Sequence, residues 1–371
     1  MIEKFPFDRT QPYNNLPLLP PSSDVIDKEI LLIWGTASRA LAELNKNILR
    51  LPNPSMLVNT ISLQEAKSSS EIENIFTTED ELYKAISDSV NEAAANPNTK
   101  EVLRYREALW TGYDTIYKTG IIDLKSIIKV YQQIKNTKED IRPPQSQVVI
   151  KRGNSEFRAG EVIYTPPRGK GIVEEKMDNL IQYLNEDTDT DPLLKMAIAH
   201  YQFEAIHPFS DGNGRTGRIL NLLYLVNKGL LSHPVLYLSK YIIQNKDDYY
   251  HNLSAITQRG SWKPWIIYML QGVEQTAGQT NRIIDDILSQ MQATLDYAKA
   301  ELKWYNKEIN EIIFTQPYIK PATIGKILKR TSRTTLTKYM SELTRRKILS
   351  VKQDGKEVYY INNDLVRILE G

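Results

Sequence analysis

Twelve consecutive residues, His207 to Arg218, combine side chains that could handle the phosphates of a nucleotide. They include a proton acceptor at His207, a carboxylate suited to a hard cation at Asp211, three glycines and two arginines. Successive N–H groups of a glycine-rich turn can bind an anion where they open a helix, because a helix N-terminus carries partial positive charge. We therefore predict a phosphate site at this connection.

The glycines and arginines have separate expected tasks. Gly212, Gly214 and Gly217 are expected to take left-handed backbone angles and to turn N–H groups toward the anion. Arg215 and Arg218 are three residues apart, so they can project from one side of a helix as a clamp for a di- or triphosphate. We expect Arg218 in the first helical turn, where a cation is disfavoured unless an anion offsets it.

Two apolar stretches should hold this connection in place. Residues 191–206 repeat apolar side chains at helical spacing, and Pro208 disfavours the helical conformation at His207, so the first helix should end there. Residues 219–226 are apolar almost all round, which predicts a buried helix ending near Gly229. His200 lies two turns before His207, but no third His or Cys is near, which favours a core role over a metal pair.

Two common nucleotide motifs match the spacing but not the context. Gly212-x-Gly214-x-x-Gly217 has dinucleotide-binding spacing, but a helix precedes it and no acid occurs between Arg218 and Lys246 to hold a ribose. The same glycines do not make a P-loop, because Arg218 and the residue after it stand where Lys and Ser or Thr are required. Both interpretations are rejected.

The run resembles the signature of the Fic (Fido) family, His-x-Phe-x-Asp/Glu-Gly-Asn-Gly-Arg-x-x-Arg, at all eight fixed positions. The resemblance implies transfer of AMP from ATP to a Ser, Thr or Tyr hydroxyl of a target protein, and of the protein itself. It also implies that His207 is the general base, that Phe209 is a packing anchor and that Asp211 binds Mg²⁺. The nucleotide contacts that it implies are Gly212, Asn213, Gly214, Arg215, Thr216, Gly217 and Arg218.

A second motif, Ser69-x-x-x-Glu73-Asn74, resembles the inhibitory helix of Fic proteins. The resemblance implies that Glu73 pairs with Arg218 and leaves ATP badly aligned for in-line attack. Alone, Glu73 could be one acid on a solvated face. Glu73 could also orient a water that removes AMP from a target, or the same residues could transfer another phosphate-containing group. A further alternative is a nucleic-acid-binding regulator with a vestigial Fic core.

Two further features follow from the resemblance. Residues 148–169 are predicted to form a hairpin, or flap, that lays a target peptide over the site through Val162, Ile163, Tyr164 and Thr165, although an ordinary surface hairpin is the alternative. Tyr249 and Tyr250 match a tyrosine pair that flanks the nucleotide in relatives. Their alternative is simple packing.

The C-terminal segment is locally basic, with eleven Lys and Arg against five Asp and Glu in residues 321–371. Helices over 322–329 and 333–346, joined by a turn at 330–332, precede a hairpin over 350–361. This order resembles a winged helix, which could bind DNA or make a protein contact.

Composition and periodicity frame these sites. A chain of 371 residues with 41% hydrophobic residues and net charge +2 is ordinary for a globular protein, and no run reaches membrane-spanning length. The absence of cysteine excludes thiolate chemistry and favours a cytoplasmic protein. A homodimer is left open.

We predict a mainly α fold with a Fic-type helical core, a small β-hairpin flap and a C-terminal winged-helix domain. The expected domains are 1–100, with the inhibitory helix, 101–285, the catalytic core, and 286–371, a linker helix with the winged helix. Residues 5–23 should form an extended lead-in. Further helices are expected over 24–51, 62–75, 79–95, 99–118, 125–134 and 173–184.

Overall fold

The computed structural model describes residues 7–21, 25–51, 54–87, 89–151, 160–186, 189–321, 324–325 and 332–370. Helices dominate this part of the chain, so the prediction of a mainly α fold is confirmed. The helices are α1 (Lys28–Ile48), α2 (Pro54–Ile72), α3 (Glu79–Ile86), α4 (Ser89–Ala94), α5 (Pro97–Thr119), α6 (Leu124–Lys135), α7 (Ile172–Asn185), α8 (Pro192–Ile206), α9 (Asn213–Asn227), α10 (Leu238–Gln244), α11 (Lys246–Arg259), α12 (Trp262–Glu301), α13 (Lys307–Ile313), α15 (Arg333–Arg345) and α16 (Asn363–Glu370).

In the structure, capping residues fix helix ends that hydrophobic periodicity predicted only approximately. The Asp27 side chain accepts the N–H groups that open α1, so this helix begins later than the predicted residue 24. Thr78 and Glu81 form a capping box at the start of α3. The predicted helix over 79–95 is divided into α3 and α4, and the predicted helix over 62–75 is longer at its start and ends at Ile72.

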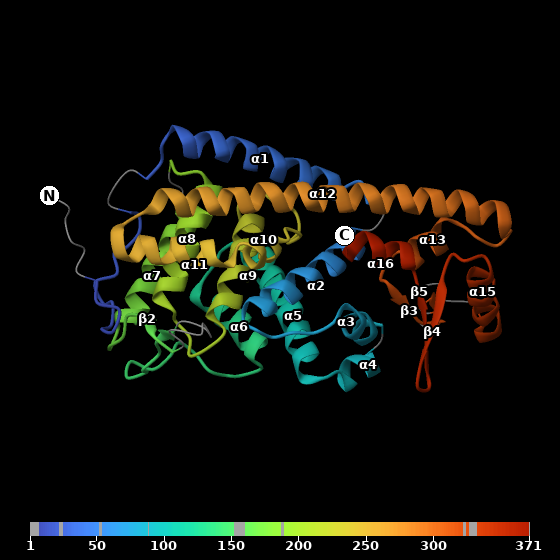
Figure 1. Cartoon of the computed structure of the whole chain (residues 1–371), viewed down its shortest axis with the longest axis horizontal. Helices are drawn as coiled ribbons and strands as arrows, with labels where there is room; N and C mark the ends of the chain where they lie inside the picture. The colour runs from blue at the N-terminus through green and yellow to red at the C-terminus, as the bar shows by residue number, and fades with distance from the viewer. Residues whose placement is uncertain are drawn as a thin grey trace.

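The buried centre of the fold is the pair α8 and α9, which carries the signature between its helices. Nearly every side chain of both helices is buried. Helices α5 and α6 pack against α9, and α7 and α12 pack against α8. Helix α12 is 40 residues long, with α1 lying along it, and it runs from the core to the C-terminal part of the chain (Figure 1).

The predicted lead-in before α1 packs on this core. Leu16 and Leu19 are buried, and the Leu16 carbonyl accepts a hydrogen bond from Lys176 on α7. The Pro17 carbonyl accepts one from Gln202 on α8. The extended segment is therefore fixed by side chains that reach its backbone carbonyls.

Strands are few and short. Strands β1 (Ile150–Lys151) and β2 (Val162–Tyr164) pair antiparallel, as the flap prediction requires, while residues 152–159 lie outside the described residues. At the C-terminal end, β3 (Tyr318–Ile319), β4 (Ser350–Asp354) and β5 (Glu357–Ile361) form a sheet in the order β3-β5-β4.

The C-terminal elements have the arrangement of a winged helix: α13, β3, then α15 and the β4–β5 hairpin (Figure 1). The predicted helix over 322–329 and the turn at 330–332 fall mostly outside the described residues, although Ser332 is described as the N-cap of α15. The predicted boundary at 285–286 falls inside α12, so one continuous helix links the two parts. In the described part of the chain, no helix is long and apolar enough to cross a membrane.

Candidate active site

The signature connects the end of α8 to the start of α9. His207 closes α8 with φ 52° and its N–H donates to the Phe203 carbonyl at 2.9 Å, so the helix ends where Pro208 predicted. Phe209 is fully buried and stacks on Tyr131 of α6, with ring centroids 3.9 Å apart. The expected packing role of Phe209 is therefore met by its geometry.

Asn213 locks this connection from within. Its side-chain oxygen accepts the Phe209 N–H and its side-chain nitrogen donates to the Phe209 carbonyl, both at 2.9 Å. The Thr216 hydroxyl donates to the Gly212 carbonyl at 2.9 Å. The side chains of Asn213 and Thr216 are thus engaged within the loop, and the groups left to face an anion are backbone N–H groups of the first turn of α9.

The expectation that three glycines turn the backbone was wrong for two of them. Gly212 has φ 74°, but Gly214 and Gly217 lie within α9. A Cβ on Gly214 would lie 2.4 Å from Glu73 Oε1, and one on Gly217 would lie 2.5 Å from Glu204 Oε1. Gly214 leaves room for the carboxylate of Glu73, Gly217 leaves room for Glu204 and the Phe203 ring of α8, and only Gly212 makes a left-handed turn.

The two arginines are buried and each is held by its own carboxylate. Arg215 and Arg218 are both 2% exposed. Arg215 Nη1 is 2.5 Å from Glu101 Oε1 on α5, whereas Arg218 Nη2 is 2.9 Å from Glu73 Oε1. Each guanidinium therefore has its own carboxylate partner. Arg218 lies in the second turn of α9, not in the predicted first turn, because the helix begins at Asn213.

The segment after α2 brings Glu73 to Arg218. Arg218 also donates to the Ser69 hydroxyl and the Ser69 carbonyl, both at 2.8 Å. Asn74 takes φ 61°, while the Ile75 N–H donates to the Ser70 carbonyl and the Asn74 N–H donates to the Glu71 carbonyl. This is a Schellman ending, in which Asn tolerates the left-handed position. The Ser69, Glu73 and Asn74 motif thus places one carboxylate on one guanidinium.

Charge neighbours set the protonation of the site. Burial lowers the pKa of the His207 imidazole to about 4, and the Arg142 guanidinium acts in the same direction. Burial acts to lower the pKa of Arg218, but Glu73, Tyr249, Tyr105 and Glu204 together outweigh burial, and the net pKa is above its usual value. At neutral pH the site therefore holds a neutral imidazole, suited to accept a proton, beside a fixed positive charge.

Asp211 lies at the open edge of the site. Its side chain is 67% exposed, and Lys135 Nζ is 2.6 Å from its Oδ2. Burial acts to raise the pKa of this carboxyl, but the hydrogen bond and charge of Lys135 keep it below its usual value. Among the described residues, no group of three or more His, Cys, Asp or Glu could hold a metal ion alone. Any ion here would need oxygen ligands from the nucleotide and water as well.

His200 and the tyrosine pair form one buried cluster. His200 Nε2 is 2.9 Å from the Tyr249 hydroxyl, and the imidazole stacks on Trp265. Burial lowers the pKa of His200 to about 3. The preference for a hydrogen-bonded core histidine is confirmed by this geometry. Tyr249 is buried as a packing residue, whereas Tyr250 is 39% exposed and packs edge-on against Tyr249.

The flap is attached to the end of α8. The Tyr164 hydroxyl donates to the Ala205 carbonyl at 2.7 Å, and the Thr165 hydroxyl donates to the Arg9 carbonyl at 2.7 Å. Both side chains are buried, so they anchor the flap and do not face a peptide. Val162 and Ile163 are half-buried. These two side chains and the backbone of β2 are therefore the parts of the flap that remain partly accessible.

Sequence reasoning missed several residues of the site: Glu101, Lys135, Arg142 and Glu204. Glu204 lies one turn before His207, and its Oε1 has no hydrogen-bond partner in the described part of the chain. Burial raises the pKa of this carboxyl to about 7, although Arg218 opposes the shift. No motif spacing signals these residues; an alignment of relatives is the signal that could find them.

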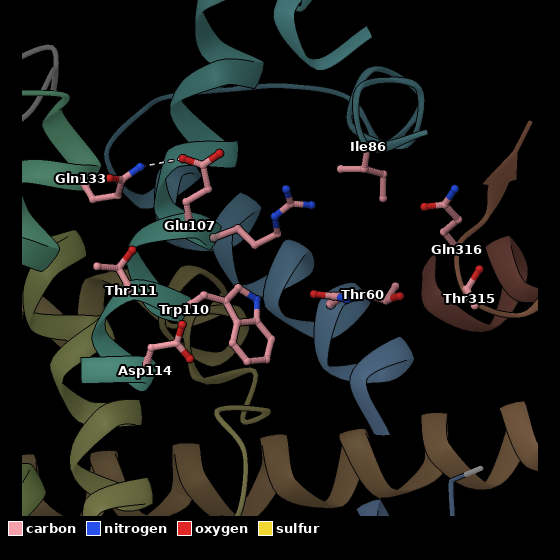
Figure 2. Close-up of a pocket in the computed structure, with 11 residues that line it drawn as sticks. Thr60, Ile86, Glu107, Trp110, Thr111, Asp114, Gln133, Thr315 and Gln316 are labelled. Atoms are coloured by element: carbon pink, nitrogen blue, oxygen red, sulfur yellow. Dashed lines mark hydrogen bonds between the residues drawn. The ribbon is translucent and has the colours of Figure 1, made fainter. Parts of the chain in front are cut away.

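A pocket of about 710 Å³ is lined by residues outside the signature (Figure 2). Figure 2 shows Glu107, Trp110, Thr111 and Asp114 of α5 along one side, with Glu107 accepting a hydrogen bond from Gln133 at 2.6 Å. Thr315 and Gln316, which follow α13, line the other side. None of the predicted site residues lines this pocket, so it is a separate feature of the α2–α5 face.

Comparisons with known proteins agree with this geometry. Residues 33–114 match the Fic/DOC family N-terminal region, residues 121–225 match the Fic/DOC family, and residues 290–365 match the C-terminal domain of SoFic-like protein adenylyltransferases. These matches cover more than half of the sequence, and the chain belongs to the Fic/DOC family.

Among similar curated proteins is protein adenylyltransferase Fic of Drosophila mojavensis, 30% identical over 193 residues, which are 51% of this chain and 36% of that protein. Protein adenylyltransferase fic-1 of Caenorhabditis elegans is 28% identical over 145 residues, which are 38% of this chain and 27% of that protein. The chain thus spans roughly a third or less of the length of these relatives.

Solved structures share the fold. A Fic family protein from Desulfovibrio desulfuricans superposes with a TM-score of 0.55 at 19% identity, covering 92% of this chain and 98% of that one. Fic-1 from Caenorhabditis elegans superposes with a TM-score of 0.51 at 20% identity, covering 68% of this chain and 72% of that one. The Fic-type helical core predicted from the signature is confirmed.

Proposed function

We propose that this protein is a protein adenylyltransferase that moves AMP from ATP to a hydroxyl side chain of a target protein and of itself. One observation carries the proposal: a neutral His207 lies at the end of α8, directly before a helix N-terminus that bears two buried arginines. The names of the similar proteins support the same activity. The target, its hydroxyl type and a cytoplasmic setting are part of the proposal.

In the proposed step, His207 accepts the proton of the target hydroxyl while that oxygen attacks the α-phosphorus of ATP. The bond between the α-phosphorus and its bridging oxygen to the β-phosphate breaks, and diphosphate leaves. First-turn N–H groups of α9 face the phosphate oxygens, and Arg215 and Arg218 bind the outer phosphates after exchanging their carboxylate partners. A single base, fixed donors and two cations meet the needs of this transfer.

Asp211 is suited to hold Mg²⁺ with the phosphates of ATP. The carboxylate is exposed and is the kind of hard oxygen ligand that Mg²⁺ prefers, with one or two carboxylates plus phosphates and water as the common arrangement. When bound, the ion neutralises charge on the leaving diphosphate. The contact between Lys135 and this carboxylate would then be replaced by the bond to the ion.

We also propose that Glu73 inhibits the transfer. Arg218 already donates to Glu73 and to Ser69, so a γ-phosphate must displace the carboxylate before it can bind the guanidinium. ATP that cannot use Arg218 is misaligned for in-line attack. The same carboxylate, 35% exposed beside the site, could position a water that removes AMP from a modified target. The sign of the Glu73 effect on each reaction distinguishes the two roles.

The flap and the winged helix are proposed to contact macromolecules. The outer edge of β2 can pair with an extended peptide by main-chain hydrogen bonds, which asks little of the target sequence. The exposed face of α15, with Thr334, Thr337 and Lys338, is suited to duplex DNA. However, Lys352 of the wing is paired with Asp80 of α3 at 2.6 Å, which favours an intramolecular role for the wing.

Isotope position tests the chemistry directly. Protein incubated with Mg²⁺ and ATP labelled at the α-phosphate should become labelled, whereas ATP labelled at the γ-phosphate should leave no label. The His207→Ala variant should lose the signal but keep ATP affinity, because it removes the base and no phosphate donor. Label from the γ-phosphate would mean that the protein transfers a phosphate group instead.

A further inference from the structure

Arg142 connects two segments of the site, the end of α8 and the chain after β2, through a buried guanidinium. It lies in the loop between α6 and β1 and is 3% exposed. Its Nε donates to the His207 carbonyl at 2.8 Å, and its Nη2 donates to the Ile206 carbonyl at 3.3 Å and to the Pro167 carbonyl. Its backbone N–H donates to the Pro208 carbonyl at 2.9 Å. All of these acceptors are backbone carbonyls at the end of α8 or just after β2.

The acceptors on α8 are the groups that a helix leaves unpaired. The last carbonyls of a helix lack intrahelical donors, and a cation placed there also interacts favourably with the helix dipole. Arg142 supplies both at the point where His207 adopts φ 52°. A left-handed angle is unfavourable for a residue with a side chain and persists only where surrounding contacts hold it.

The third acceptor of the guanidinium, the Pro167 carbonyl, ties it to the flap. Pro167 follows β2, and Tyr164 at the end of that strand donates to the Ala205 carbonyl at 2.7 Å. The flap is thus joined to the last turn of α8 at two points. A guanidinium is a planar fork with several donors, so it can hold carbonyls of two segments at once, which a lysine ammonium on a flexible stem does less well.

We propose that Arg142 is a positioning residue that fixes the catalytic imidazole relative to the flap. The proposal rests on the proposed function, because the flap matters only if a target peptide docks there. Arg142 bonds no residue assigned to the phosphates, so its removal should reduce the rate of transfer and leave ATP affinity nearly unchanged. A 1 Å misplacement of reacting groups can cost about 100-fold in rate, and we expect a loss of roughly 10- to 100-fold.

The charge of Arg142 and the hydrogen-bonding geometry of its guanidinium can be tested separately, because the charge affects the pKa of His207. After burial, its guanidinium is the main influence that lowers the pKa of His207, while the Glu204 backbone, Glu73 and Asp211 act in the opposite direction. Arg142→Lys keeps a positive charge but loses the fork, whereas Arg142→Gln loses both. The two variants should therefore differ in the pKa of His207 while both lose transfer rate.

The test compares these variants with Arg106→Gln, which removes another guanidinium with a burial-lowered pKa, on α5 and paired with Glu92. Each full-length protein, in the Glu73→Gly background, is assayed for self-modification rate, ATP affinity and thermal unfolding. Histidine ring resonances are followed by NMR across pH, with His207→Gln to assign the signal among the four histidines. Tyr164→Phe, which removes one hydroxyl, tests the second attachment point.

The proposal predicts that both Arg142 variants transfer AMP more slowly while their ATP affinity is unchanged. The pKa of His207 should rise in Arg142→Gln and rise less in Arg142→Lys. Arg106→Gln should change neither the transfer rate nor the pKa of His207. Tyr164→Phe should lose several-fold in rate. If Arg142→Gln does not fold, the lysine and phenylalanine variants decide the outcome. The proposal would be overturned if the Arg142 variants transferred AMP as fast as Arg106→Gln, or if they lost ATP affinity in parallel with rate. No transfer even in Glu73→Gly would overturn the proposed function instead, while the His207 resonance still reports whether Arg142 holds the imidazole.

Discussion

Replacing Glu73 by glycine tests the inhibitory contact, and the structure sets the size of the effect. Glu73 accepts a hydrogen bond from Arg218 at 2.9 Å, and Arg218 keeps its two bonds to Ser69 when that acceptor is lost. A hydrogen bond between charged groups contributes about 1.5–3 kcal/mol. Because the Glu73 side chain is 35% exposed, solvent screening reduces this to about 1–2 kcal/mol.

That free energy predicts an increase of roughly 5- to 30-fold in AMP incorporation for Glu73→Gly, since about 1.4 kcal/mol corresponds to a factor of ten. The assay measures the initial rate of self-labelling from α-labelled ATP. Glu71→Gly is the matched control, because Glu71 lies at the same helix end but pairs with Lys67 at 3.3 Å. Equal rates in wild type and Glu73→Gly, or an equal rise in Glu71→Gly, would refute the reasoning. If Glu73 instead positions a water, Glu73→Gly should abolish removal of AMP from a modified target.

Three further predictions follow from the geometry. Gly217→Ala should destabilise the fold by about 1–3 kcal/mol, because the added Cβ would lie 2.5 Å from Glu204 and 2.9 Å from the Phe203 ring. The midpoint of thermal unfolding should fall in this variant but not in Gly278→Ala, which has open space around the added Cβ. In a pH profile of kcat/KM, the decline on the acid side should lie near pH 4, the lowered pKa of His207, and not near its usual 6.5. Because His207 of the unfolded chain binds its proton near pH 6.5, the free energy of unfolding should decrease as the pH falls from 6.5 to about 4. If the winged helix binds duplex DNA, deleting residues 321–371 should weaken that salt-sensitive binding, measured by titration at increasing salt. No DNA binding by the full chain at low salt would favour a protein contact, in line with the pairing of Lys352 with Asp80.

The sequence was informative where one short segment carries both the chemistry and its support. The helix before His207 could be predicted, because Pro208 ends it and apolar periodicity marks it. The contact between Glu73 and Arg218 could be inferred only through the resemblance to Fic proteins. The winged-helix hairpin around Asp354 followed from turn chemistry and is present as β4 and β5.

Other parts of the site depend on packing between distant segments. Arg142 reaches His207 across 65 residues, Lys135 reaches Asp211 across 76, and Glu101 reaches Arg215 across 114. No spacing rule relates such positions. The glycines illustrate the same limit, because a glycine needed for a turn and one needed for close helix approach are identical in sequence and differ only in what surrounds them.

The most direct measurement of the central claim is the intact mass of the Glu73→Gly protein after incubation with ATP and Mg²⁺, compared with Glu73→Gly/His207→Ala treated in the same way. The account predicts a gain equal to one or more AMP groups in the first protein and an unchanged mass in the second. An unmodified Glu73→Gly protein, a gain equal to a phosphate group, or the same AMP gain without His207 would contradict it.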